Sequence, residues 1–242
     1  MSADVEPAGG SIDLGLPPAQ PPVLLVHGFA SSHQLNWVRN GWVDLLVDAG
    51  RSVHGVDLLG HGCAPKPTDP EAYRAVEDLV QQHRADVPVV DAIGFSAGAD
   101  LLLTLITRYP DSFRRVVLMG IGDAAVGADA DRVDQRRAMR EAIDWLVDRA
   151  DNPSALRAFL QRPRPTDRLR RLGDITARVH VVIGTADHGY PSDALGAAIP
   201  GCTVTAIPGL DHFATPGDIR AVGSALDFLA TGVPTKERTA RP

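Results

Sequence analysis

The chain has 242 residues, of which 44% are hydrophobic, and this is enough to bury the core of one α/β domain. Its formal net charge is −6, and acids alternate with bases at short range between residues 129 and 140, whereas a nucleic-acid-binding protein would normally show a basic stripe. Cys63 and Cys202 are the only cysteines and lie far apart, so the sequence suggests neither a zinc site nor a disulfide framework.

The two ends of the chain are rich in proline, glycine and charge, so we expect mobile segments at 1–20 and 233–242. No basic region followed by an apolar region is visible near the first residue, so no signal peptide is predicted. The apolar runs fall far short of the roughly 20 residues needed to cross a bilayer. We therefore expect a cytoplasmic protein without a membrane span.

Short apolar runs alternate along the chain with stretches in which apolar residues recur every three or four positions. The runs predict buried strands at 22–27, 52–57, 87–95, 115–120, 179–184 and 203–207. The stretches between them predict helices at 37–49, 71–84, 97–109, 193–198 and 217–230. Strands that alternate with helices in this way predict an α/β fold with a mostly parallel central sheet flanked by helices.

One segment, 121–167, breaks the alternation because it contains no strand-like run. It shows a polar helix around 132–149 and a shorter helix around 153–161. We expect a short helical cap here, inserted over the carboxyl edge of a core formed by 21–120 and 168–232. Four arginines at positions 132, 136, 137 and 140 would suit an acidic substrate, but acids surround them, which favours a solvated face.

The sharpest motif is Gly-Phe-Ser-Ala-Gly at 94–98, which lies between a predicted strand and a predicted helix. A nucleophile elbow requires this context, since its strained turn projects a serine hydroxyl from the end of the strand. The motif therefore predicts Ser96 as a catalytic nucleophile. A structural glycine-rich turn is the alternative, because so short a pattern also arises by chance.

A serine hydroxyl is a poor nucleophile until a base removes its proton. His212 follows the last predicted strand, so it lies at the edge where parallel sheets place their chemistry, and we predict that it is this base. A histidine on a surface loop is the alternative.

The histidine in turn needs a carboxylate that holds its tautomer. Asp187 comes directly after the strand predicted at 179–184, and we predict that it is the triad acid. Asp123 is the main rival, because it lies just past another predicted strand. Asp211 adjoins His212 but would point away from it, and Asp57 ends a strand that precedes the serine.

An oxyanion hole needs two N–H donors near the nucleophile. The backbone of Ala97 supplies one, and Phe29, which follows the first predicted strand in His27-Gly28-Phe29, supplies the other. Gly28 lacks the Cβ that would block a close backbone approach. A plain strand-ending turn at His27-Gly28 is the alternative.

Over residues 21–229 the chain resembles an α/β-hydrolase of the esterase and lipase kind. The matching pieces, in their order along the chain, are His27-Gly28-Phe29, Asp57-Leu58-Leu59-Gly60-His61-Gly62, Gly94-Phe95-Ser96-Ala97-Gly98, Gly184-Thr185-Ala186-Asp187 and Asp211-His212-Phe213. The order serine, acid, histidine is also that of the family. The resemblance implies a structural role for His61, and Cys63 stands where a serine is common.

The resemblance implies a serine hydrolase that cleaves a small-molecule carboxylic ester or thioester through an acyl-enzyme on Ser96. It implies no cofactor and no metal, and nothing in the sequence suggests a nucleic-acid partner. Relatives that open epoxides or displace halide carry an aspartate at the elbow, unlike this chain. Two alternatives stay open: acyl transfer to an acceptor other than water, and a scaffold that binds a small ligand without turning it over.

Overall fold

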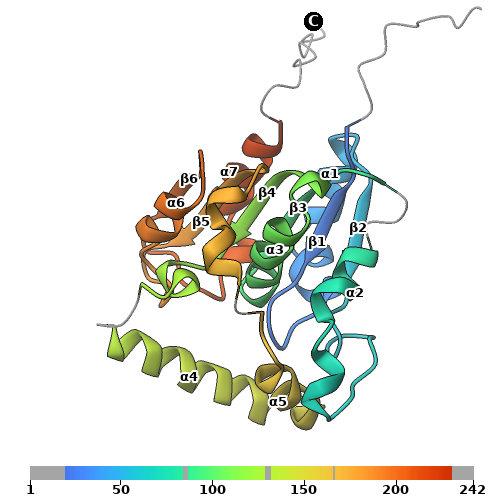
Figure 1. Cartoon of the computed structure of the whole chain (residues 1–242), viewed down its shortest axis with the longest axis vertical. Coiled ribbons are helices and arrows are strands. Elements are labelled where there is room, and N and C mark those ends of the chain that lie inside the picture. The colour runs from blue at the N-terminus through green and yellow to red at the C-terminus, as the bar shows by residue number, and fades with distance from the viewer. Residues whose placement is uncertain (1–19, 84–86, 129–131, 166, 231–242) are drawn as a thin grey trace, which may run out of the picture.

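A computed structural model describes residues 20–83, 87–128, 132–165 and 167–230, and its centre is a parallel sheet of six strands (Figure 1). The strands are β1 (Val23–Val26), β2 (Val53–Val56), β3 (Val90–Phe95), β4 (Phe113–Met119), β5 (Arg178–Gly184) and β6 (Thr203–Ile207). Their spatial order is β2-β1-β3-β4-β5-β6. The predicted α/β class and parallel sheet are confirmed.

The register of the sheet brings distant segments to one edge. Val26 at the end of β1 pairs with Gly94 near the end of β3, and Gly184 at the end of β5 pairs with Ile207 at the end of β6. Because all strands run in the same direction, the loops that follow these four strands leave the sheet at its carboxyl edge.

Helices cover both faces of the sheet, as alternating strand residues require. Leu24 and Val26 belong to a buried cluster that contains side chains of α2 (Val76–Gln82), α3 (Ala97–Arg108) and α6 (Asp193–Ala198). Val23 and Leu25 belong to a second cluster on the other face, with side chains of α1 (Trp42–Asp48) and α7 (Ile219–Ala230).

Two predicted helices are interrupted, and the backbone explains why. The helix expected at 37–49 consists of a π-helical turn, Gln34–Val38, and of α1, with Gly41 between them at φ 76°, outside the helical region. The helix expected at 71–84 consists of a 3₁₀ turn, Pro70–Tyr73, and of α2, and its last residue lies outside the described part of the chain.

The segment between β4 and β5 folds into α4 (Val133–Asp148) and α5 (Pro153–Gln161), followed by a 3₁₀ segment, Arg168–Asp174. Figure 1 shows α4 and α5 lying together across one end of the sheet. Only Val147 of α4 is fully buried, whereas α5 buries four side chains, so α5 holds this region to the core.

The expected mobile ends, apart from Gln20, lie outside the described residues. Within the described ranges, no helix combines the length and the apolar character that a bilayer crossing requires.

Candidate active site

Ser96 occupies a strained turn between β3 and α3. Its φ of 52° and ψ of −114° are unfavourable for a residue with a side chain, and the turn is held because the Ser96 N–H donates to the Met119 oxygen at 2.8 Å. Two glycines make the turn possible. A Cβ on Gly98 would overlap the Val26 carbonyl oxygen, and one on Gly94 would lie 2.7 Å from the Gly98 carbonyl carbon. The local geometry is therefore that of a nucleophile elbow.

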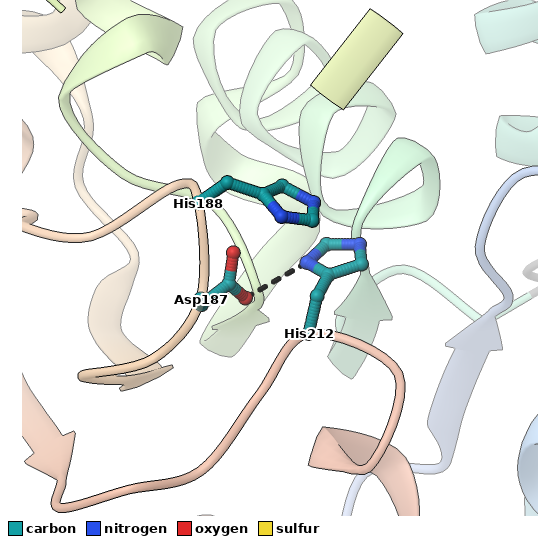
Figure 2. Close-up of side chains that lie close together, drawn as sticks. All are labelled: Asp187, His188 and His212. Atoms are coloured by element: carbon teal, nitrogen blue, oxygen red, sulfur yellow. Dashed lines mark hydrogen bonds and ion pairs between the residues drawn. The ribbon is translucent and has the colours of Figure 1, made fainter. Parts of the chain in front are cut away.

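His212 connects Ser96 to Asp187 through two hydrogen bonds. Its Nε2 lies 3.0 Å from the Ser96 Oγ, and its Nδ1 lies 2.8 Å from the Asp187 Oδ2 (Figure 2 shows the second contact). An ionised carboxylate only accepts hydrogen bonds, so Nδ1 carries the proton and Nε2 can accept one from the serine.

The loops that carry the acid and the base are fixed to each other by the backbone. The Ala186 N–H donates to the Leu210 oxygen at 3.0 Å, which joins the two loops. Within the loop of the acid, the Gly189 N–H donates to the Asp187 Oδ1 at 2.7 Å. Burial by itself would raise the pKa of Asp187, but the hydrogen bonds from His212 and Gly189 outweigh it, and the pKa lies below its usual value. Asp187 is therefore ionised at neutral pH.

The rival acids have other partners. The Asp123 Oδ1 accepts hydrogen bonds from the N–H groups of Ala194 and Leu195 at 2.8 and 3.1 Å, so this buried carboxylate stabilises the first turn of α6. Asp57 accepts from the N–H groups of His33 and Cys63, and Asp211 accepts from the N–H of Ala214.

Phe29 and Ala97, the expected oxyanion donors, line the same cavity as Ser96. Ala97 is the first residue of α3, where N–H groups have no acceptor within the helix. The loop of Phe29 is held because the Gly28 N–H donates to the Asn36 Oδ1 at 2.8 Å. A Cβ on Gly28 would lie 2.8 Å from the Phe95 ring, so this loop approaches the elbow closely only because residue 28 is glycine.

A cavity of about 460 Å³ opens above Ser96 between the sheet edge and the helices α4 and α5. Apolar side chains from both helices form its upper wall: Met139, Ala142, Ile143 and Leu146 from α4, and Phe159 and Leu160 from α5. Sites of this size and character hold small organic ligands with a few fixed polar groups.

Two buried histidines, His27 and His61, do not line the cavity. The His27 Nε2 accepts from the Leu58 N–H at 3.0 Å and its Nδ1 donates to the Gly28 oxygen at 2.7 Å, which ties the end of β1 to the loop after β2. The His61 ring packs edge-on against Phe29 and Phe159. Burial lowers the pKa of each histidine to about 4, so both are neutral at physiological pH.

Sequence reasoning missed His188, for which the only available signal was its position beside Asp187. Its ring lies 5.0 Å from the His212 ring (Figure 2). Burial, and then the nearby His212, lower the pKa of His188. The ligand atoms of Asp187, His188 and His212 lie within 4.8 Å of one another, close enough to hold a metal ion, but the Asp187–His212 hydrogen bond already uses two of them.

Comparison with known proteins places the chain in a family. A family model described as alpha/beta hydrolase fold matches residues 21–187, which is more than half of the chain. The chain therefore belongs to the α/β-hydrolase fold family.

Relatives in this family include esterases and lipases. The chain is 28% identical over 167 residues to a (lyso)-N-acylphosphatidylethanolamine lipase of Bos taurus, covering 63% of this chain and 47% of the lipase. It is 33% identical over 152 residues to a pimeloyl-[acyl-carrier protein] methyl ester esterase of Neisseria meningitidis, covering 60% of this chain and 44% of the esterase. The chain thus matches less than half the length of each of these relatives.

Solved structures with the same fold include an enol-lactonase from Burkholderia xenovorans, with a TM-score of 0.65, 19% identity, and coverage of 87% of this chain and 92% of that one. An esterase from a Rhodococcus species has a TM-score of 0.63 at 22% identity, with coverage of 88% and 91%. At this level of identity the similarity establishes the fold.

Proposed function

We propose that the protein is a serine hydrolase that cleaves a carboxylic ester or thioester through an acyl-enzyme on Ser96. The observation that carries this proposal is the unbroken hydrogen-bond chain from the Ser96 Oγ through His212 to Asp187. The esterase and lipase names of the relatives agree with it.

In the first half of the reaction the Ser96 Oγ attacks the carbonyl carbon while the His212 Nε2 takes the hydroxyl proton. The tetrahedral intermediate collapses, the bond to the leaving alcohol or thiol breaks, and His212 returns the proton to that group. In the second half a water molecule attacks the acyl-enzyme, with His212 again acting first as base and then as acid. Asp187 keeps the imidazole oriented and stabilises its protonated form.

The N–H groups of Phe29 and Ala97 are proposed to bind the oxyanion of both tetrahedral intermediates. Such donors act in a partly dry site where they need no reorganisation, and loss of one commonly costs about 100-fold or more in rate. The helix dipole of α3 adds to the field at Ala97.

We further propose that residues 121–167 form a cap on a core of 21–120 and 168–232. The contribution of α4 and α5 to the upper wall of the cavity supports this division. Since that wall is apolar, the cap would select the acyl or alkyl part of the substrate.

The direct test is hydrolysis of p-nitrophenyl esters of increasing acyl length by the wild-type protein and by Ser96→Ala. We expect turnover in the wild type and its loss in the variant. Ser154→Ala is the matched control, because Ser154 is an exposed serine on α5. Full activity in Ser96→Ala would contradict the proposal.

A further inference from the structure

A second cavity, of about 510 Å³, adjoins the one above Ser96. The two share four lining residues: Ala124, Met139, His188 and Gly189. His188 packs against the catalytic His212, so the two cavities meet beside the triad. A ligand with its reacting carbonyl at Ser96 can therefore extend past His188 into the second cavity.

The outer wall of this second cavity is basic. Arg132, Gln135, Arg136 and Arg140 line it, and the three arginines are spaced four residues apart. Residues at this spacing share one side of a helix, here the side of α4 and its start that lines the second cavity.

Arg137 shows what an arginine on the solvated side of α4 does. It is 67% exposed and forms ion pairs with Asp134 at 3.2 Å and with Glu141 at 3.9 Å. Arg136 and Arg140 are exposed as well, as a solvated face predicts, but unlike Arg137 they also line the second cavity.

Charge inside the two cavities has the opposite sign to that of the whole chain. The charged residues that line them are Arg132, Arg136, Arg140, Arg162, Arg164, Arg168 and one acid, Asp100. The chain as a whole carries a formal charge of −6. Arg168 pairs with Asp100 at 2.6 Å, and arginines outnumber acids in the combined lining by six to one. A positive field focused in a cavity attracts anions.

One of these arginines, Arg132, is already fixed in place. Its guanidinium donates to the Tyr190 oxygen at 2.8 Å and lies 3.6 Å from the buried Asp123 carboxylate. Arg132 thus attaches the start of α4 to the loop after β5 and positions the two arginines that follow it on the helix.

We propose that Arg136 and Arg140 bind an anionic group, a phosphate or a carboxylate, that belongs to the substrate whose ester is held at Ser96. Guanidinium groups suit this task because their planar, charged donors match the oxygens of either anion. The inference rests on the proposed function and narrows it, since the substrate is then an anionic amphiphile with its apolar part under the cap.

Binding to Ser96→Ala tests the site without turnover. Titration calorimetry would compare hexyl phosphate, hexanoate, inorganic phosphate and hexanol. We expect hexyl phosphate or hexanoate to bind at least about tenfold more tightly than hexanol. The affinity for the anionic ligand should fall as the ionic strength rises. Inorganic phosphate that binds as tightly as hexyl phosphate would overturn the assignment to a substrate, because a free anion would then be the ligand.

The test uses a double variant in which Arg136 and Arg140 are both replaced by glutamine. The matched control is Arg137→Gln, at a position of α4 that does not line the cavity. The double variant, built on Ser96→Ala, should lose the preference for the anionic ligand, and the control should keep it. Equal preference in the double variant and in the control would overturn the proposal, and circular dichroism would verify that α4 is intact in both.

The two proposals fail separately. If Ser96→Ala hydrolyses esters as fast as the wild type, the hydrolase proposal fails, and the calorimetric comparison still decides the anion site. Suppose instead that Ser96 is required for turnover, but the double arginine variant binds hexyl phosphate and hexanoate as tightly as Ser96→Ala with both arginines intact. The anion site alone then fails.

Discussion

Asp187 and His212 are separated by 25 positions in the chain, yet a hydrogen bond of 2.8 Å joins the Asp187 Oδ2 to the His212 Nδ1. The two side chains come from the loops after β5 and β6, which are neighbours in the sheet. The parallel pairing of these strands therefore positions the acid for the base, and the first two predictions follow from it.

Replacing Asp187 by asparagine should impair catalysis without unfolding the protein. The amide would allow the wrong imidazole tautomer, so kcat for p-nitrophenyl esters should fall by about 10,000-fold. The measurement is steady-state kinetics at pH 7.5, with the melting temperature recorded in parallel. An Asp187→Asn protein with near-normal kcat would show that another acid serves His212.

Asp123→Ala should give the opposite pattern. Its carboxylate accepts the N–H groups of Ala194 and Leu195 in the first turn of α6, and leaving these donors unsatisfied costs about 1–3 kcal/mol of stability. Denaturant titration should show that loss, while kcat stays close to that of the wild type. A folded Asp123→Ala protein without activity would make Asp123 the triad acid instead.

Gly98→Ala should destabilise the fold strongly, because the new methyl group overlaps the Val26 backbone oxygen, which cannot move without breaking β1 from its neighbours. We expect a loss of about 3 kcal/mol or more in the free energy of unfolding. Gly223→Ala in α7 is the control. It meets open space and should stabilise the protein by about 0.5–1 kcal/mol through helix propensity. Equal effects of the two changes would contradict the geometry of the elbow.

Leu146→Trp should shift substrate preference toward shorter acyl chains. Leu146 is a half-buried residue of α4 in the cavity wall, and an indole there would occupy space above Ser96. The ratio of kcat/KM for long over short p-nitrophenyl esters should fall about tenfold. Its neighbour Trp145 is 54% exposed, so Trp145→Leu should leave the acyl-length profile unchanged. A profile that is the same in Leu146→Trp and the wild type would remove α4 from the substrate site.

Stability should rise with pH between about 4 and 6.5. In the folded protein burial lowers the pKa of His27 and of His61 from 6.5 to about 4, so between these values the unfolded chain binds more protons than the folded one. At pH 5 unfolding should take up about two protons from this pair. The free energy of unfolding, measured from pH 4.5 to 7.5, therefore increases as pH rises through this window.

His61→Phe isolates one of these groups, since a phenyl ring can keep the edge-on contacts with Phe29 and Phe159. It should reduce the pH slope contributed by the pair by about half. Stability that falls as pH rises from 4.5 to 6.5 would show that these histidines are not held neutral in the fold.

The parallel sheet and the site residues could be predicted from the sequence because their signals are local. The central strands β1, β3, β4 and β5 are short runs of mostly buried residues. The strands expected at 52–57 and 203–207 are correct in position, but β2 and β6 are largely not buried because they form the two edges of the sheet. Ser96 lies in a turn whose flanking glycines are needed by close backbone contacts. Asp187 and His212 each follow a strand, and in a parallel sheet this alone places them at one edge.

The rest depends on contacts that no local pattern encodes. Whether Asp187 or Asp123 faces His212 is decided by the path of the loops after β4 and β5, where the Gly122 backbone packs closely against Gly189 and Pro191. His188 becomes part of the site through the same loop. Acids alternate with bases around Arg136 and Arg137, so the sequence predicts a solvated face for both. That Arg136 also lines a cavity and Arg137 does not depends on how α4 packs.

Covalent trapping tests the central claim most directly. The wild-type protein would be treated with a fluorophosphonate, which reacts with activated serines, and the adduct would be located by peptide mass spectrometry. We predict one adduct per chain, on Ser96, with much slower labelling in His212→Ala, where the serine lacks its base. Labelling at another residue, or ester turnover that persists after the probe has fully modified Ser96, would contradict the proposal that Ser96 is the nucleophile.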